Sequence, residues 1–125
     1  MIEMKNKLIN KFVESRLKQV LINDLDSYQV KDSNEAYNLQ EIVNEKLSLS
    51  GLGEVIGYKI GCTNKSIQKE LGVNCPIFGP IFKNKIINSN KTIYIKEFTK
   101  VGVECEIYIK ISKEVNENTN YNINF

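Results

Sequence analysis

The sequence predicts an α+β fold, with helices in the first part of the chain and strands in the rest. Apolar residues recur at spacings of three and four before residue 50, which is the period of an amphipathic helix. From residue 55 onward, β-branched and aromatic residues form short runs separated by glycine, proline and asparagine. A chain of 125 residues has room for one small domain. We therefore expect one domain over 1–125, helical over 1–50 and β-rich over 51–125.

Two helices are expected in the helical part. The first covers about residues 4–23, with its apolar stripe formed by Leu8, Ile9, Phe12, Val13, Leu17, Val20 and Leu21. Asp32 or Ser33 can cap the second helix, and Glu35 follows Asp32 by three residues as in a capping box. Gly51 and Gly53 should end this helix and begin a turn.

The β-rich part should begin with a strand over 53–63, GEVIGYKIGCT. A short helix over 64–71 should follow, with Thr63 as its cap and Gly72 at its end. The next segment, CPIFGPIF at 75–82, is interrupted by proline and glycine, so we expect a structured loop with an edge strand.

Three further strands are expected in the last part of the chain. Two are short, at 85–87 and 92–95. The clearest covers 101–111, where Val103, Cys105, Ile107, Ile109 and Ile111 alternate onto one face. The other face then carries Glu104, Glu106, Tyr108 and Lys110.

Composition excludes several classes of function. The net charge is only +2, and the basic residues are sixteen scattered lysines and one arginine, so we expect no nucleic-acid partner. No apolar run approaches the ~20 residues of a membrane helix, and the N-terminus lacks the apolar core of a secretory signal, which predicts a cytoplasmic protein without a membrane partner.

Cysteine and histidine usage restricts the possible chemistry further. The chain has three cysteines, none in CxxC spacing, and no histidine. Cys62, Cys75 and Cys105 are therefore expected to be reduced and mostly buried thiols. Catalysis without histidine must use carboxylates, lysine, tyrosine or a bound metal ion.

Glu104 and Glu106 are the candidate metal ligands. On a strand their side chains share one face, with Cα atoms roughly 6.5–7 Å apart, so both can reach one ion. Carboxylate oxygens favour Mg²⁺ or Mn²⁺. The alternative is an ordinary solvent-facing strand whose acidic residues pair with Lys96 or Lys100.

Lys59 is the candidate catalytic and substrate-binding residue. It lies between Gly57 and Gly61, and glycine within a strand marks a bulge or the close approach of a backbone or ligand. Lys59 could neutralise a substrate carboxylate, or act as an acid or base if burial or a metal lowers its pKa. The alternative is an exposed strand lysine.

Four motifs together resemble the 2-keto-4-pentenoate hydratase and 4-oxalocrotonate decarboxylase family, of the fumarylacetoacetase-like fold. The resemblance covers about 34–113 and rests on AYNLQ (36–40), GYKIGCT (57–63), LGVNCPIFGPIF (71–82) and VECEIYIKI (103–111). It implies N-terminal helices followed by the first strands of a mixed β-barrel or roll. It also implies a hydro-lyase of the 2-keto-4-pentenoate (2-hydroxypenta-2,4-dienoate) hydratase type that acts on a small 2-oxo acid or its dienol. A 4-oxalocrotonate-type decarboxylase is the alternative.

The resemblance also implies roles for the candidate residues. Glu104 and Glu106 match the first two ligands of the family's Mg²⁺ or Mn²⁺, and a third acidic residue completes that site. Lys59 matches the lysine of the G-x-K-[IV]-G motif, which binds substrate and transfers a proton. Ile77 stands where many hydratases carry an acidic residue, and Val101 and Gly102 stand where proline and arginine are frequent.

Full-length family members are roughly twice as long as this chain. We therefore expect a truncated chain with an incomplete domain, inactive alone and dependent on a C-terminal half for the third ligand. A non-catalytic remnant that serves as an interaction module is the alternative from another class. A homo-oligomer, in which two copies share a site, is a further possibility.

Overall fold

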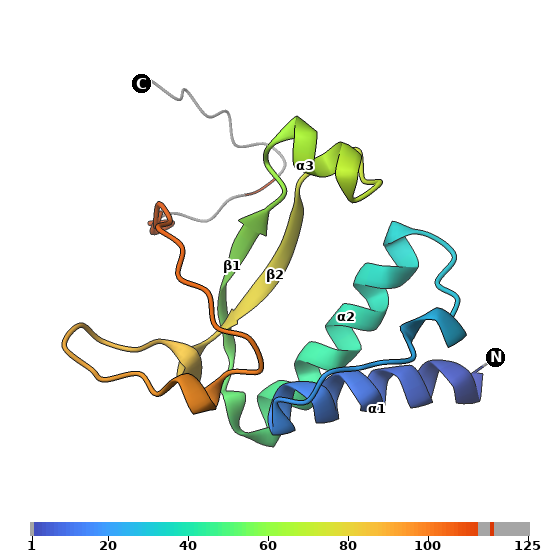
Figure 1. Ribbon diagram of the computed structural model, residues 1–125, viewed down its shortest axis with the longest axis horizontal. Helices are drawn as coiled ribbons and strands as arrows, with labels where there is room; N and C mark the ends of the chain where they lie inside the picture. The colour runs from blue at the N-terminus through green and yellow to red at the C-terminus, as the bar shows by residue number, and fades with distance from the viewer. Residues whose placement is uncertain (1, 113–115, 117–125) are drawn as a thin grey trace.

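The computed structural model describes residues 2–112 and 116. Its regular elements are α1 (Ile2–Lys18), α2 (Ser33–Leu47), β1 (Val55–Gly61), α3 (Lys65–Glu70) and β2 (Ile77–Phe82). Figure 1 shows α1 and α2 on one side of the β1–β2 ribbon, with α3 at its far end. Helices beside a small antiparallel sheet make an α+β arrangement, as the sequence predicted. A two-stranded sheet is not a closed barrel, so the fumarylacetoacetase-like barrel stays a prediction.

Helix α1 is shorter than its apolar period predicted. It ends at Lys18, and Gln19 adopts a left-handed conformation with φ 56°. The amide of Val20 then bonds back to the carbonyl of Ser15 at 3.2 Å, the 6→1 hydrogen bond of a Schellman motif. The apolar spacing continued into Val20 and Leu21, but both side chains are exposed. The prediction of a helix to residue 23 was therefore wrong at its C-terminal end.

Helix α2 begins at the residue that the sequence indicated, and it ends at Leu47, before the two glycines that were expected to end it. The Asp32 side chain accepts a hydrogen bond from the Glu35 amide at 2.9 Å, which satisfies one free donor of the first turn. The Glu35 carboxylate accepts from the Lys31 amide at 2.6 Å, one residue earlier than in a standard capping box. A π-helical turn, Ser48–Leu52, follows the helix, and Gly51 and Gly53 take φ values of 105° and 77°.

The short helix α3 is present, although its cap was assigned to the wrong residue. Asn64, and not Thr63, is the N-cap, and its side chain accepts a hydrogen bond from the Ser66 amide at 2.7 Å. Gly72 ends the turn after α3 with φ 68°, as expected.

Strands β1 and β2 pair antiparallel, with Lys59 opposite Gly79 and Gly61 opposite Ile77. The register shifts by one residue between Val55 and Gly57, which marks a bulge at the start of β1. Segment 75–82 therefore does contain an edge strand, as predicted. Pro80 fits in β2 because a strand with one neighbour leaves one side free of ladder hydrogen bonds.

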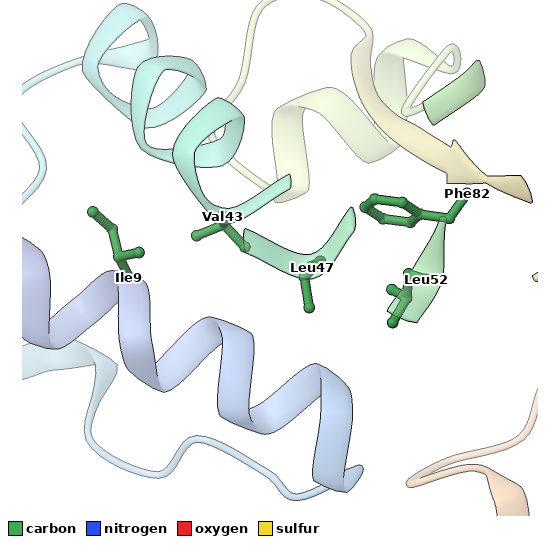
Figure 2. Close-up of a cluster of buried hydrophobic side chains, with 5 residues drawn as sticks. All are labelled: Ile9, Val43, Leu47, Leu52 and Phe82. Carbon is green, nitrogen blue, oxygen red and sulfur yellow. The ribbon is translucent and has the colours of Figure 1, made fainter. Parts of the chain in front are cut away.

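The core lies where the two helices meet the start of the sheet. Figure 2 shows its five clustered side chains, which come from α1, α2, the π-helical turn and β2: Ile9, Val43, Leu47, Leu52 and Phe82. Leu47 and Phe82 are each only 2% exposed. No helix among the described residues is long and apolar enough to cross a membrane.

The three strands expected in the last part of the chain are not formed. Lys83–Lys85 and Ile95–Glu97 are 3₁₀ turns, and residues 101–112 contain neither helix nor strand. Val103 and Ile107 are 94% and 91% exposed. Alternation alone does not make a strand, because the backbone still needs a partner for its ladder hydrogen bonds.

The cysteines are free, but they are less buried than predicted. Cys62 is half-buried, whereas Cys75 and Cys105 are exposed. The expectation that Cys105 is a core residue opposite the glutamates was wrong, because segment 101–111 packs against no second layer in the described part of the chain.

Candidate metal and substrate site

The structure brings the three predicted site residues together. Lys59 extends from β1, and its Nζ lies 3.0 Å from Oε2 of Glu104. The same ammonium donates a hydrogen bond to Oε1 of Glu106. These residues are 45 and 47 positions apart in sequence, so the contact depends on the segment after β2 returning to the sheet. In Figure 1 this segment loops away from the end of β2 before it returns.

The pKa of Lys59 is shifted in the direction opposite to one of the two expectations from the sequence. Its hydrogen bond to Glu106, and then its hydrogen bond to Glu104, raise the pKa of the lysine above its ordinary value. A lysine with a lowered pKa, ready to act as a base, was expected as one alternative and is not observed. The ammonium instead stays protonated. The glutamates pair with Lys59, and not with Lys96 or Lys100 as their alternative interpretation proposed.

The two carboxylates converge on one cation. One oxygen of Glu104 and one of Glu106 meet at a single positive charge, the Lys59 ammonium. Hard divalent cations take carboxylate oxygens, so this donor set fits Mg²⁺ or Mn²⁺. Within residues 2–112 and at 116, no group of three or more acidic, cysteine or histidine side chains is placed to hold a metal. The described residues thus offer two carboxylates at this point and no third acidic side chain beside them.

All three side chains are accessible to water. The side chains of Lys59, Glu104 and Glu106 are 51%, 72% and 57% exposed. Exposed ion pairs contribute little to stability because water screens them. The cluster is therefore held by weak interactions that can separate without disturbing any buried packing.

A cavity of about 610 Å³ adjoins this cluster between α1, α2 and the sheet. Lys59 lines it together with Gly61, Ile77 and Gly79 from the strands. The helices contribute mainly apolar side chains, among them Phe12, Leu39 and Val43. Lys59 thus borders both the carboxylate pair and an apolar hollow.

The aromatic side chains at the margin of the cavity were not predicted as site residues. The ring of Phe78 stacks on Tyr37 of α2 with centroids 4.4 Å apart, and it meets Tyr58 edge-on at 5.7 Å. The Phe78 amide also donates a hydrogen bond to the Tyr37 hydroxyl at 3.3 Å. The sequence signal was the motif pair AYNLQ and CPIFGPIF, whose members meet here across helix and strand.

Comparison with known proteins gives a consistent set of relatives. The chain is 31% identical over 84 residues to a 2-keto-4-pentenoate hydratase of Burkholderia vietnamiensis, a match that covers 67% of this chain and 32% of the relative. It is 30% identical over 90 residues to a 2-keto-4-pentenoate hydratase of Paraburkholderia xenovorans, covering 72% and 33%. The chain belongs to the 2-keto-4-pentenoate hydratase family.

A third family member in the comparison is the TodF product hydratase of Pseudomonas putida, 29% identical over 84 residues, covering 67% of this chain and 31% of the relative. The chain spans about a third of the length of these curated hydratases. No family model and no solved structure matches the chain.

Proposed function

We propose that this chain supplies the metal-binding carboxylates and the substrate-binding lysine of a hydro-lyase that acts on 2-oxo acids or their dienols. The observation that carries the proposal is the convergence of Glu104 and Glu106 on Lys59 beside an apolar cavity. Family membership supports it, because the named relatives are hydratases.

Glu104 and Glu106 are the residues that would hold Mg²⁺ or Mn²⁺. The ion, when bound, acts as a Lewis acid that polarises a substrate oxygen and stabilises developing negative charge. Tight binding of such an ion needs more than two carboxylates. We propose that a third acidic ligand comes from residues beyond those described here, supplied by further polypeptide.

Lys59 would change partners when an ion binds. In the structure its ammonium pairs with both carboxylates, and this pairing raises the pKa of the lysine. A divalent cation balances both negative charges and releases the ammonium toward the cavity that Lys59 also lines. There the positive charge can hold the carboxylate of a 2-oxo acid, and the protonated amine can donate a proton.

Decarboxylation of a related 2-oxo acid is the second candidate, and one observation favours it. Ile77 lines the cavity and is apolar, where many hydratases carry an acidic residue. An apolar wall offers no group to position the water that hydration adds. A substrate that loses CO₂ needs no such water.

Metal binding by the full chain tests the proposal. Glu104→Gln keeps the size of the side chain and removes one charged ligand, so we expect Mn²⁺ affinity, measured by calorimetry, to fall at least about ten-fold. Glu97→Gln, which changes an exposed glutamate outside the cluster, is the matched control and should bind Mn²⁺ as the wild type does. Lys59→Met removes the competing ammonium and should strengthen Mn²⁺ binding.

Equal Mn²⁺ affinities for Glu104→Gln and Glu97→Gln would refute the metal assignment. With metal and the polypeptide that supplies the third ligand both added, the absorbance of a 2-hydroxy-2,4-dienoate then separates the two reactions. Loss of this absorbance, together with a product that has gained one water molecule, supports hydration. Release of CO₂ from a 2-oxo dicarboxylic acid, with no loss of the dienoate, would replace hydration by decarboxylation.

A further inference from the structure

We propose that two copies of this chain associate through segment 101–111, which pairs as an antiparallel strand with the same segment of the second copy. The two-fold axis passes through Ile107, so that Glu104 lies opposite Lys110 of the other copy. This interaction surface is independent of the proposed function, because the pairing needs neither a metal ion nor a substrate.

The first support is a row of exposed apolar side chains in this segment. Val103, Ile107, Ile109 and Ile111 are 94%, 91%, 73% and 66% exposed. They alternate with polar residues, so an extended backbone would place all of them on one face. The structure forms neither helix nor strand over 101–112, so the backbone of this segment makes no ladder hydrogen bonds. Strand-forming residues with a free backbone are a template for another strand.

The second support is that the apolar row is complementary to itself. When two identical strands pair antiparallel about a two-fold axis, residues equally distant from the axis lie opposite each other. With Ile107 on the axis, Val103 meets Ile111 of the second copy, and Cys105 meets Ile109. Every residue of the row then faces another residue of the row, so the segment needs no partner of different sequence.

The third support is charge complementarity on the polar face. The same register places Glu104 opposite Lys110 of the second copy, and the two-fold axis repeats this pair. Opposite charges at directly opposed strand positions stabilise the pairing of the strands. Lys110 is exposed and has no salt-bridge partner among residues 2–112 and 116, so its charge is available. Glu106 lies opposite Tyr108, whose hydroxyl can donate a hydrogen bond to a carboxylate.

Contacts with β1 lower the entropic cost of forming this strand. Lys59 pairs with both Glu104 and Glu106, which restricts the middle of the segment. A restricted segment loses less conformational entropy on pairing than a free one. These contacts use side chains only, and β1 is paired along its backbone with β2 alone. The backbone of 101–111 therefore remains available to a second copy.

A register centred on Cys105 is the competing arrangement. It would also keep the apolar row together, but it would place Glu104 opposite Glu106 of the second copy, and the axis would repeat this pair. Like charges at directly opposed positions are destabilising. The Lys59 of each copy carries one charge and would balance only one of the two carboxylates beside it. The register centred on Ile107 is therefore the better fit.

The mass of the full chain in solution tests the pairing. Size-exclusion chromatography with light scattering, without added metal, should give a mass that rises from 14.3 kDa toward twice that value as the protein concentration increases. An interface made by one strand pair is small and therefore weak, so dilute protein should be monomeric, with the segment exposed as in the structure.

A charge on the axis should abolish the association. Ile107→Lys places two ammonium groups opposite each other and should raise the dissociation constant of the dimer at least about ten-fold. Ile95→Lys is the matched control, since Ile95 is 73% exposed and lies outside the segment, and it should associate as the wild type does. Thermal unfolding of dilute protein, followed by circular dichroism, should give the same midpoint for both variants.

Lys110→Glu tests the charge pairs separately from the apolar row. It sets a carboxylate opposite Glu104 at both ends of the paired region, so the dimer should again weaken several-fold. Lys91→Glu makes the same charge change at an exposed lysine outside the segment and should leave the association unchanged.

Disulfide formation tests the register. Residues on the axis have Cα atoms roughly 4.5–5.5 Å apart, which suits a disulfide. Ile107→Cys, in a chain with Cys75→Ser and Cys105→Ser, should therefore form a covalent dimer with glutathione disulfide, which is reduced to two molecules of glutathione. Cys105 of the wild type lies about 13 Å along the strand from its counterpart and should form none.

Three results would overturn the inference. One is a mass of 14.3 kDa at every concentration, which would leave segment 101–111 to β1 of its own chain or to other polypeptide. Another is a mass that grows beyond two copies, because a two-fold contact closes at the dimer. The third is a disulfide through Cys105 and not through position 107, which would assign the competing register. None of these results bears on the Mn²⁺ affinities that test the proposed function.

Discussion

Residues 2–82 and residues 83–112 belong to one chain but are organised differently. The first region contains all the described α-helices and β-strands and all the described buried side chains. In the second region every residue is exposed, although its apolar side chains alternate over 101–111. The contacts that hold the second region to the first are polar, for example Lys83 with Glu54 at 2.9 Å and Thr99 with the Gln19 carbonyl at 2.8 Å.

The comparison shows that the two candidate metal ligands lie on the region with fewer packing contacts. Lys59 belongs to a strand with a paired neighbour, whereas Glu104 and Glu106 lie on a segment without ladder hydrogen bonds. Their ion pairs with Lys59 connect the two regions at the site itself. We expect that further strands, paired with segment 101–111, would make this contact rigid.

Truncating an apolar side chain should reveal the largest difference between the two regions, measured as the loss in the free energy of unfolding. Phe82 is 2% exposed and joins β2 to both helices, so Phe82→Ala should lower the free energy of unfolding by about 3–5 kcal/mol. Ile107 is 91% exposed, and Ile107→Ala should change the free energy of unfolding by no more than about 0.5 kcal/mol. Urea titration followed by circular dichroism measures both. Similar losses for the two variants would mean that segment 101–111 is packed in solution.

Local sequence patterns predicted most helices and strands of residues 2–82, because the hydrogen bonds that begin and end these elements form between nearby residues. A cap such as Asp32 and a left-handed glycine such as Gly72 act within a few residues, so sequence is enough to place them. The end of α1 was missed because apolar spacing continued beyond Lys18, and the left-handed turn there uses Gln19 in place of glycine. A strand at 101–111 was predicted but is not formed, because pairing depends on a partner strand that no local pattern specifies.

The site was predictable as a set of residues and not as an arrangement. The motif spacing selected Lys59, Glu104 and Glu106, and the structure places them in contact. Their mutual pairing could not be read from sequence, because it depends on how the chain between β2 and Glu104 returns. The cavity was also missed, because apolar periodicity indicates which face of a helix is covered and does not distinguish a filled interface from a hollow one.

A capping substitution tests the local stability of the first region and should have a medium effect. Asp32→Ala removes the acceptor for the Glu35 amide, so the free energy of unfolding should fall by about 1 kcal/mol. Asp26→Ala is the control, since Asp26 is an exposed aspartate that caps no α-helix. Urea titration at neutral pH provides the measurement. A loss no larger than that of the control would show that α2 is held by its packing alone.

The smallest expected effect is a change in the free energy of unfolding at acid pH. It tests whether the polar contacts of the first region persist in solution. The pKa of Glu35 is lowered by its hydrogen bond from the Lys5 ammonium and then by the one from the Lys31 amide. A carboxyl with a lowered folded-state pKa stabilises the fold above its unfolded pKa of about 4.3, and this stabilisation is lost as the pH falls through the folded value. Wild type should therefore be more stable than Glu35→Gln at pH 7, and the difference should shrink toward pH 3.

Glu41→Gln, on the exposed side of the same helix, removes the same charge without either contact, so its difference from wild type should be smaller at pH 7. A gap between wild type and Glu35→Gln that stays constant from pH 7 to pH 3 would mean that the carboxylate of Glu35 is not held by Lys5 and Lys31 in solution. The first region would then resemble the second in its polar contacts and differ from it only in its core.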